Sequence, residues 1–258
     1  MLDNSKSTPI AGVLDASERL NIETRFGVAA EQVARDHVIS HALAAIASVG
    51  TDSVVFFGGT ALSRTLLSDV RLSEDIDLIA MGARREVGDR IEAAITRRFR
   101  RSFGTAVFTP RIRDTRPPDP AVLHVDATRI QIQLLSSAAY PAWPTEVVTI
   151  EQRYSDAPPA KLRVLTTAGF VASKLAAWND REAPRDLYDL WALARLGKID
   201  AEASEVFSRH GSYTSLSQVS FTRPPSEAAW EAALSHQCRP AVGPGEAARI
   251  VEEAISQL

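Results

Sequence analysis

The stretch Ser53-Val-Val-Phe-Phe-Gly-Gly-Thr-Ala-Leu62 determines much of the expected fold. Its continuous apolar, β-branched and aromatic first half is typical of a buried strand. The glycine pair ends this strand, and a helix is expected to begin at Ala61. Glycines at such a turn let the backbone approach a ligand closely, and the free amides of a following helix favour an anion. A plain tight turn is the simpler interpretation, so this segment alone predicts only a strand, a turn and a helix.

A second stretch, Arg71-Leu-Ser-Glu-Asp-Ile-Asp-Leu-Ile79, places acidic residues in an otherwise apolar strand. Because side chains alternate along a strand, Asp75 and Asp77 are expected on the same face, about 7 Å apart. Such carboxylates repel each other unless a cation lies between them or water screens them, and Mg²⁺ prefers oxygen ligands of this kind. A solvent-facing edge strand would also explain the pair. The apolar neighbours indicate a buried strand, where an unpaired carboxylate is costly, so the pair predicts a site for Mg²⁺.

Two later segments carry charges at helical spacing. The ammonium group of Lys174 lies beside the apolar face of its helix, and it either extends along that face to water or reaches a phosphate. In Arg185-Asp-Leu-Tyr-Asp-Leu190, the residues Asp186 and Asp189 lie one helical turn apart. Asp186 would also stabilise the N-terminus of a helix that begins at Pro184. Each segment therefore has a sufficient structural explanation when it is taken singly.

The remaining pattern predicts a strand-rich first half and a helix-rich second half. Strands are expected over 53–57, 75–79, 105–109, 122–125 and 129–135. Helices are expected over 29–49, 84–101, 168–178, 184–195, 201–210, 226–236 and 245–257. The first twenty-odd residues are polar and are expected to fray. This order indicates an α+β protein with a polar segment at 1–27, an α+β domain at 28–160 and a helical C-terminal domain at 161–258.

Taken together and in this order, the four segments resemble those of the AbiEii/AbiGii-type toxins, a branch of the polymerase-β-like nucleotidyltransferase superfamily. The matching segments are Gly58-Gly-Thr-Ala-Leu62, Arg71-Leu-Ser-Glu-Asp-Ile-Asp-Leu78, Lys174-Leu-Ala-Ala177 and Arg185-Asp-Leu-Tyr-Asp-Leu190. The resemblance covers roughly residues 28–195 and makes 28–160 the expected nucleotidyltransferase domain. It implies a mixed sheet with flanking helices, followed by the helical C-terminal domain.

The resemblance also implies roles for individual residues. Asp75 and Asp77 would hold Mg²⁺, Lys174 would neutralise phosphate charge, and Asp186 would complete the catalytic set. Nucleotide binding would fall to Gly58, Gly59, Thr60, Arg71 and Ser73. A hydroxyl group would attack the α-phosphorus of an NTP, and pyrophosphate would leave while the metal offsets the charge.

The sequence departs from the resembled family at a third carboxylate. Relatives often carry an acid on a later strand, where this sequence has Gln131 and Gln133, and Asp126 lies only on the approach to that strand. Either Asp186 takes the place of the missing acid, or a single metal ion binds firmly. The general base that would activate the attacking hydroxyl also stays open.

The placement of charge bears on the partner. The helix expected over 84–101 is rich in arginine, and Arg97, Arg98 and Arg101 are the candidate RNA contacts. A solvated arginine-rich face is the alternative, because arginine is common throughout this chain. The histidines show no metal-ligand spacing and are expected to be packing or surface residues.

Composition narrows the class of protein. The 258 residues carry a net charge of −3 and a single cysteine, Cys238, which excludes an internal disulfide and a cysteine-based zinc site. No apolar run reaches the length of a membrane helix, and the N-terminus lacks the apolar core of a signal peptide. We therefore expect a cytoplasmic protein that does not enter a membrane.

The leading interpretation is an Mg²⁺-dependent nucleotidyltransferase toxin of a toxin–antitoxin or phage-defence system. It would transfer NMP from NTP to RNA, with the tRNA 3′ end as acceptor, and so block translation and growth. A cognate antitoxin from an adjacent gene is the expected partner, with or without a stable complex. One alternative keeps the chemistry but uses a protein or small-molecule hydroxyl. The other is a regulator that binds a nucleotide without catalysis, which the two glutamines would fit.

Overall fold

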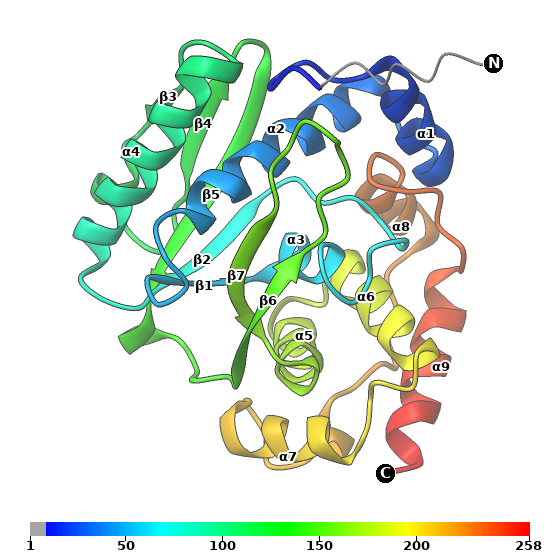
Figure 1. Ribbon diagram of the computed structural model, residues 1–258. Helices are drawn as coiled ribbons and strands as arrows, with labels where there is room; N and C mark the ends of the chain where they lie inside the picture. Colours follow the sequence, from blue (N-terminus) through cyan, green and yellow to red (C-terminus); the bar gives the residue numbers. More distant parts are fainter. Residues whose placement is uncertain (1–8) are drawn as a thin grey trace, which may run out of the picture.

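The structure is a computed structural model that describes residues 9–258. Its centre is a mixed sheet of seven strands in the order β3-β4-β5-β2-β1-β7-β6 (Figure 1). The strands are β1 (Val54–Phe57), β2 (Ile76–Ala80), β3 (Val107–Thr109), β4 (Ala121–Val125), β5 (Thr128–Ser136), β6 (Thr145–Ile150) and β7 (Ala160–Leu165). The sheet and the helical region that follows it confirm the predicted α+β class.

The register of the central strands places Asp77 in the middle of the sheet. β1 runs antiparallel to β2 with Phe57 opposite Asp77, and β5 runs parallel to β2 with Gln133 opposite the same aspartate. Because side chains alternate, Ile76 and Leu78 point to the other face, where both are fully buried. The face that carries Asp77 is therefore the polar face of the sheet, and the other is the apolar face.

Helices cover both faces. In the described residues they are α1 (Ala16–Phe26), α2 (Ala30–Ala47), α3 (Gly58–Ser63), α4 (Arg84–Ser102), α5 (Thr167–Arg181), α6 (Pro184–Arg195), α7 (Ala201–His210), α8 (Glu227–Leu234) and α9 (Pro244–Ser256). α2 and α4 pack against each other on the apolar face, whereas α5 lies over the polar face and packs on α6 and α7 (Figure 1). α8 and α9 pack on α6. Within residues 9–258, no helix combines the length and the apolar character needed to cross a membrane.

The polar N-terminal segment differs from its prediction. Residues 16–26 form α1, which begins after Asp15, whose carboxylate accepts hydrogen bonds from backbone amides of the first turn. Ile22 and Phe26 lie one turn apart and are buried in a small cluster with Tyr154. The expected fraying is therefore wrong for 16–26, because a cap and an apolar pair fix this helix. Residues 1–8 of the same segment lie outside the described residues.

The sequence analysis also missed β6 and β7. Both strands follow proline-containing segments, Tyr140–Pro144 and Asp156–Pro159, and no strand was expected between 136 and 167. β7 nevertheless begins with alternating buried and more exposed positions. β7 pairs in parallel with β1 and antiparallel with β6, so it lies inside the sheet. The domain boundary expected between residues 160 and 161 thus falls at the start of β7, an inner strand of the sheet. One hydrophobic cluster contains residues from both sides of this boundary.

Candidate active site

The turn between β1 and α3 brings the backbone against functional side chains. Gly58 has a φ of +77°, a conformation that favours glycine, and α3 begins there rather than at the predicted Ala61. A Cβ atom on Gly58 would collide with the carboxylate of Asp77, and one on Gly59 would lie 2.7 Å from Nη2 of Arg71. The glycine pair therefore allows the backbone to lie close to the side chains of Asp77 and Arg71. A simple tight turn would not require this.

Asp75 and Asp77 face the same cavity, as the alternation along the strand predicted. This cavity, called here the polar cavity, has a volume of about 230 Å³. Neither carboxylate makes a hydrogen bond or an ion pair within the described part of the chain. Burial raises the pKa of both groups, and the charge of Asp75 helps to raise the pKa of Asp77 to about 6. Converging carboxylates without a protein partner are a favourable place for a divalent cation.

Positive side chains surround the two aspartates. The polar cavity is also lined by Arg71, Lys174, Arg181 and Arg185. Guanidinium groups bind phosphate oxygens through paired hydrogen bonds, and an ammonium group binds them as a point charge. The polar cavity therefore has the charges needed to hold a polyphosphate together with a divalent cation.

A buried ion-pair network fixes two of these cations. The guanidinium of Arg71 donates to both oxygens of Asp189, at 2.7 Å from Nε and 2.8 Å from Nη2. Nζ of Lys174 lies 2.6 Å from Oδ2 of Asp189 and 2.9 Å from Oδ1 of Asp186. Burial alone would lower the pKa of Lys174, but the two carboxylates raise it above its usual value. Lys174 is therefore a fixed positive charge at the wall of the polar cavity.

Asp186 lies behind this wall. Lys174 and Arg181 engage both of its carboxylate oxygens, with Nε of Arg181 2.7 Å from Oδ2, and Asp186 is not among the residues that line the polar cavity. Burial alone would raise the pKa of Asp186, but Lys174 and Arg181 hold it well below its usual range. Asp186 was predicted to belong to the catalytic set, and in the fold its carboxylate contacts the cations Lys174 and Arg181.

The remaining residues predicted to bind a nucleotide occupy two kinds of position. Ser73 lines the polar cavity, and its Oγ would lie 3.2 Å from a Cβ atom placed on Gly59. The hydroxyl of Thr60 is buried and donates to the backbone carbonyl of Asp75. Thr60 therefore holds the start of β2 in place, while Ser73 is accessible from the polar cavity.

Glutamines occupy the strand positions where the resemblance led us to expect a third acid. Gln133 lies opposite Asp77 in the sheet, and both Gln131 and Gln133 line the polar cavity. Nε2 of Gln133 donates to the carbonyl of Pro118 at 2.6 Å. Among the described residues that line the polar cavity, Asp75 and Asp77 are the carboxylates, so no third acid joins them there.

Only part of the arginine-rich α4 presents free charge. Arg97 and Arg101, both predicted RNA contacts, are exposed. The third, Arg98, is half-buried and donates from Nη2 to Nδ1 of His41 at 3.1 Å. Arg84 donates to the carbonyl of Leu134 at 2.6 Å and is likewise used inside the fold. The exposed arginines lie on α4, which packs against the apolar face of the sheet, so they are outside the polar cavity.

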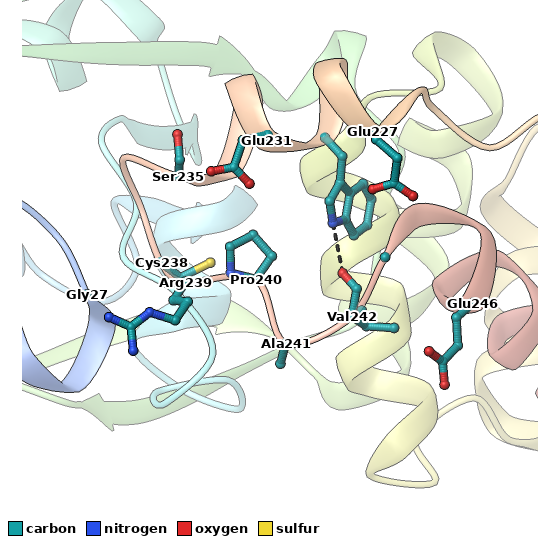
Figure 2. A pocket seen from close by; sticks show the side chains of 12 residues that line it. Gly27, Glu227, Glu231, Ser235, Cys238, Arg239, Pro240, Ala241, Val242 and Glu246 are labelled. Carbon is teal, nitrogen blue, oxygen red and sulfur yellow. Dashed lines mark hydrogen bonds between the residues drawn. The ribbon is translucent and has the colours of Figure 1, made fainter.

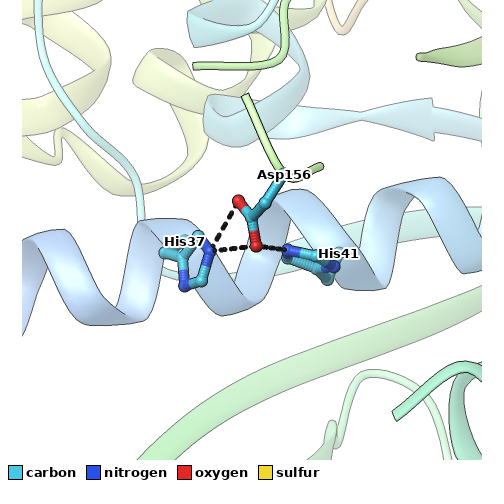
Figure 3. A group of neighbouring side chains, drawn as sticks. All are labelled: His37, His41 and Asp156. Atoms are coloured by element: carbon cyan, nitrogen blue, oxygen red, sulfur yellow. Dashed lines mark hydrogen bonds and ion pairs between the residues drawn. The ribbon is translucent and has the colours of Figure 1, made fainter. Parts of the chain in front are cut away.

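The sequence analysis missed a buried cluster on α2. Nε2 of His37 and Nε2 of His41 each lie 2.9 Å from the carboxylate of Asp156 (Figure 3). The histidines are four residues apart in the sequence, so they lie on the same face of the helix. That spacing was the available signal, but nothing in the sequence indicated that Asp156 would join them.

Hydrogen bonds already satisfy this cluster, although its residue types could hold a metal ion. Because Arg98 donates to Nδ1 of His41, the imidazole proton lies on Nε2 and points to Asp156. A metal ion on Nε2 would require the opposite tautomer, with an N–H group facing the guanidinium. Asp156 also accepts from the backbone N–H of Gly12 at 2.8 Å. The cluster therefore fits a structural role that ties two loops to α2.

Acid should weaken this cluster. Burial lowers the pKa of His41 from 6.5 to about 4, so the folded protein holds a neutral imidazole that the unfolded chain protonates more readily. The free energy of unfolding should therefore fall as the pH drops from about 6.5 towards 4, and His41 should add no pH dependence above that range. Urea titrations between about pH 7 and pH 5 measure the effect. A His41→Gln variant should lose less stability over this interval, and an equal loss would contradict the assignment.

A larger cavity lies in the C-terminal region. It has a volume of about 630 Å³ and is lined by side chains of α8, by Glu246 of α9 and by the segment between these helices (Figure 2). Glu227 and Glu231 give it an acidic wall. Burial raises the pKa of the Cys238 thiol to about 11, so this thiol is protonated and unreactive at neutral pH. None of the site residues predicted from the sequence lines this cavity.

A comparison with protein families gives the class of protein that has this fold and polar cavity. The sequence model of the family described as "Nucleotidyl transferase AbiEii toxin, Type IV TA system" matches residues 41–254. The chain belongs to this family, and it is a nucleotidyltransferase toxin of a toxin–antitoxin system.

Solved structures resemble the whole chain. MenT4, a nucleotidyltransferase toxin from Mycobacterium tuberculosis, matches with a TM-score of 0.70 at 18% sequence identity, covering 95% of this chain and 89% of that one. A putative nucleotidyltransferase from H. pylori matches with a TM-score of 0.49 at 14% identity, covering 89% of this chain and 95% of that one. A search of curated protein sequences found no significant match. The likeness to MenT4 supports the fold, and the family match gives the class of activity.

Proposed function

We propose that this toxin transfers a nucleoside monophosphate from an NTP to RNA in an Mg²⁺-dependent reaction, with the 3′ end of tRNA as the acceptor. The main support is the polar cavity, where Asp75 and Asp77 lack protein partners among the described residues and face cationic side chains. Family membership gives the nucleotidyltransferase activity and implies an NTP substrate and an antitoxin. The metal, the RNA acceptor and an antitoxin encoded by the adjacent gene belong to the proposal.

The residues of the polar cavity fit a magnesium ion. Asp75 and Asp77 offer carboxylate oxygens from one face of a strand. Burial is the main cause of their raised pKa values, and the charge of Asp75 adds to the increase at Asp77. When bound, Mg²⁺ would neutralise and orient phosphate oxygens. Gln131 and Gln133 can add neutral amide oxygens but no third charge, so we propose one firmly held ion.

The protein's own side chains would bind the triphosphate and offset its charge. Gly58 and Gly59 leave room for phosphates beside the backbone, and Arg71 and Lys174 present fixed positive charges because Asp189 holds both. The acceptor hydroxyl forms a bond to the α-phosphorus as the bond to pyrophosphate breaks, and the hydroxyl proton passes to solvent or to a base. Cations fixed before the reaction stabilise the negative charge that develops on the phosphates. In this account Asp186 and Asp189 are positioning residues.

The exposed arginines of α4 favour RNA as the acceptor. Arg97, Arg100 and Arg101 are exposed within one helical turn and a half, where they can contact successive phosphates of a nucleic-acid backbone. A small-molecule acceptor would gain nothing from charges that lie outside the polar cavity. This surface, here called the α4 basic surface, is therefore the proposed contact for RNA.

Removing two charges from the α4 basic surface should weaken the use of RNA selectively. We expect Arg97→Ala combined with Arg101→Ala to raise the KM for tRNA about fivefold to tenfold and to lower its dependence on salt, because fewer counterions are released. The affinity for NTP should stay unchanged. Steady-state transfer assays over a range of salt concentrations measure both effects. Arg223→Ala, at another exposed arginine, is the matched control, and equal KM values in all three proteins would exclude this contact.

Transfer of label tests the proposed reaction directly. The protein is incubated with Mg²⁺, NTPs labelled on the α-phosphate, and either total tRNA or tRNA whose 3′-terminal ribose has been oxidised with periodate. Label on intact tRNA alone supports the proposal. Label on the oxidised tRNA would place the reaction at another position, and label on protein or on neither RNA would refute an RNA acceptor.

A further inference from the structure

A second cavity adjoins the polar cavity at Asp77. It has a volume of about 430 Å³, within the range of ligand-binding pockets. The two cavities are joined at the proposed site of reaction, because both are lined by Gly59, Asp77, Gln133, Lys174 and Arg181. The rest of the second cavity is lined mainly by aromatic and small residues, with Asp180 as a further charged residue, and it is called here the aromatic cavity.

Rings form one wall of the aromatic cavity. Phe57 and Tyr140 lie with their ring centroids 4.9 Å apart, and Trp143 and His210 meet edge to face at 5.9 Å. All four residues line the cavity. Aromatic rings that line a cavity can stack with any of the nucleobases, because each base has a flat π-face.

Small side chains of α5 form another part of the lining. Ala176 and Ala177 line the cavity beside Lys174, where longer side chains would occupy the space. The methyl groups of these alanines and the aromatic rings make up the apolar part of the lining, called here the apolar slot, while Asp180 and Arg181 add charge beside it. A flat apolar group can enter this slot while a charged group attached to it stays near Lys174.

The chemistry of an NTP matches the two joined cavities. Its α-phosphate, where the reaction occurs, links a charged pyrophosphate portion on one side to an apolar, aromatic nucleoside on the other. Asp77 and Lys174 lie at the junction, and the polar cavity holds most of the cations. If the pyrophosphate portion occupies the polar cavity, the nucleoside must extend from the α-phosphate into the aromatic cavity.

We propose that the aromatic cavity binds the nucleoside of the incoming NTP, with the base between the aromatic wall and Ala177. This inference rests on the proposed function, because it takes NTP as the ligand and the polar cavity as the phosphate site. It assigns Tyr140 and Ala177 as residues that determine nucleotide affinity. Ala177 ends the Lys174–Ala177 segment quoted above, where it was given no role, and Tyr140 was not a predicted site residue.

Tyr140 also brings a polar group to the cavity wall. Its hydroxyl lies near the indole N–H of Trp143, which makes no regular hydrogen bond in the described part of the chain. Burial raises the pKa of Tyr140 to about 12, so the hydroxyl keeps its proton at neutral pH. It can therefore donate a hydrogen bond to a carbonyl or ring nitrogen at the edge of a base.

Calorimetric binding to the full-length protein tests this assignment. The ligands are α,β-methylene analogues of the four NTPs, which cannot be cleaved at the α-phosphorus, and inorganic tripolyphosphate, which has no nucleoside; Mg²⁺ is present throughout. Ala177→Leu should weaken binding of the favoured analogue about tenfold or more, because the leucine side chain fills the slot, and should change tripolyphosphate binding less than about twofold. Tyr140→Ala should act in the same direction. Ala228→Leu, the same substitution on an exposed position of α8, should change neither affinity.

The outcomes separate this inference from the function on which it rests. Unchanged analogue affinity in folded Ala177→Leu and Tyr140→Ala would overturn the assignment. If the same variants raised the KM for tRNA instead, the aromatic cavity would be a binding site for the RNA acceptor. Wild-type protein that binds neither the analogues nor tripolyphosphate would instead refute the proposed function. Thermal unfolding of each variant verifies that it is folded. If Ala177→Leu does not fold, the analogue affinity of Tyr140→Ala alone tests the assignment.

Discussion

Replacing Asp77 with asparagine should abolish nucleotide transfer and growth inhibition while leaving the fold intact. Asparagine keeps the size of the side chain but removes the charge that would hold Mg²⁺, so we expect a loss of roughly a thousandfold or more in transfer. The stability should stay the same or rise, because the buried carboxylate has no partner among the described residues and its pKa of about 6 reflects an unfavourable environment. Labelled-NTP transfer, expression toxicity and thermal unfolding measure the three effects.

The matched control for Asp77→Asn is Asp126→Asn. Asp126 is exposed at the turn between β4 and β5, and its positive φ of 49° suits asparagine as well as aspartate. This variant should transfer nucleotides and inhibit growth like the wild type. Full toxicity of folded Asp77→Asn would remove the enzymatic account altogether.

Replacing Gly58 with alanine should damage the site through geometry alone. The new Cβ atom would collide with the carboxylate of Asp77, and the positive φ at this position disfavours any side chain. We expect a loss of about a hundredfold in transfer, because displacement of a catalytic group by about an ångström has effects of that size. The stability should fall by about 1 kcal/mol from the backbone conformation. Transfer assays and urea titrations measure the two losses.

A second glycine separates strain from collision. Gly104 also has a positive φ, +81°, but a Cβ atom placed there would meet nothing within 4 Å. Gly104→Ala should therefore lose a similar amount of stability and keep its activity. If Gly58→Ala transfers nucleotides as well as Gly104→Ala does, the close approach of the turn to Asp77 has no catalytic importance.

The parts of the candidate site formed by residues close together in the sequence could be predicted from local patterns. Alternation along one strand placed Asp75 and Asp77 on the same face, and the glycine pair marked the turn beside them. The apolar runs also gave the α+β class and most helices. These features were accessible because each depends on a few consecutive residues.

Contacts between distant residues were not accessible in the same way. No local pattern indicated that Asp189 would join Arg71 to Lys174, because these two residues are far apart along the chain. Asp186 therefore looked like a candidate for the missing third acid, while its actual partners are cations. The aromatic cavity likewise combines residues of β1, the segment before β6 and the end of α7, which only the fold brings together.

The late position of β7 has a consequence for synthesis of the toxin. A ribosome that stops before residue 160 releases a fragment with both glycines and both aspartates, yet β1 would lack its parallel neighbour and expose an unpaired edge. Lys174 and Asp189 would also be missing from that fragment. Products that stop before residue 160 are therefore unable to assemble the polar cavity, and a cell meets the active toxin only after synthesis has passed Asp189.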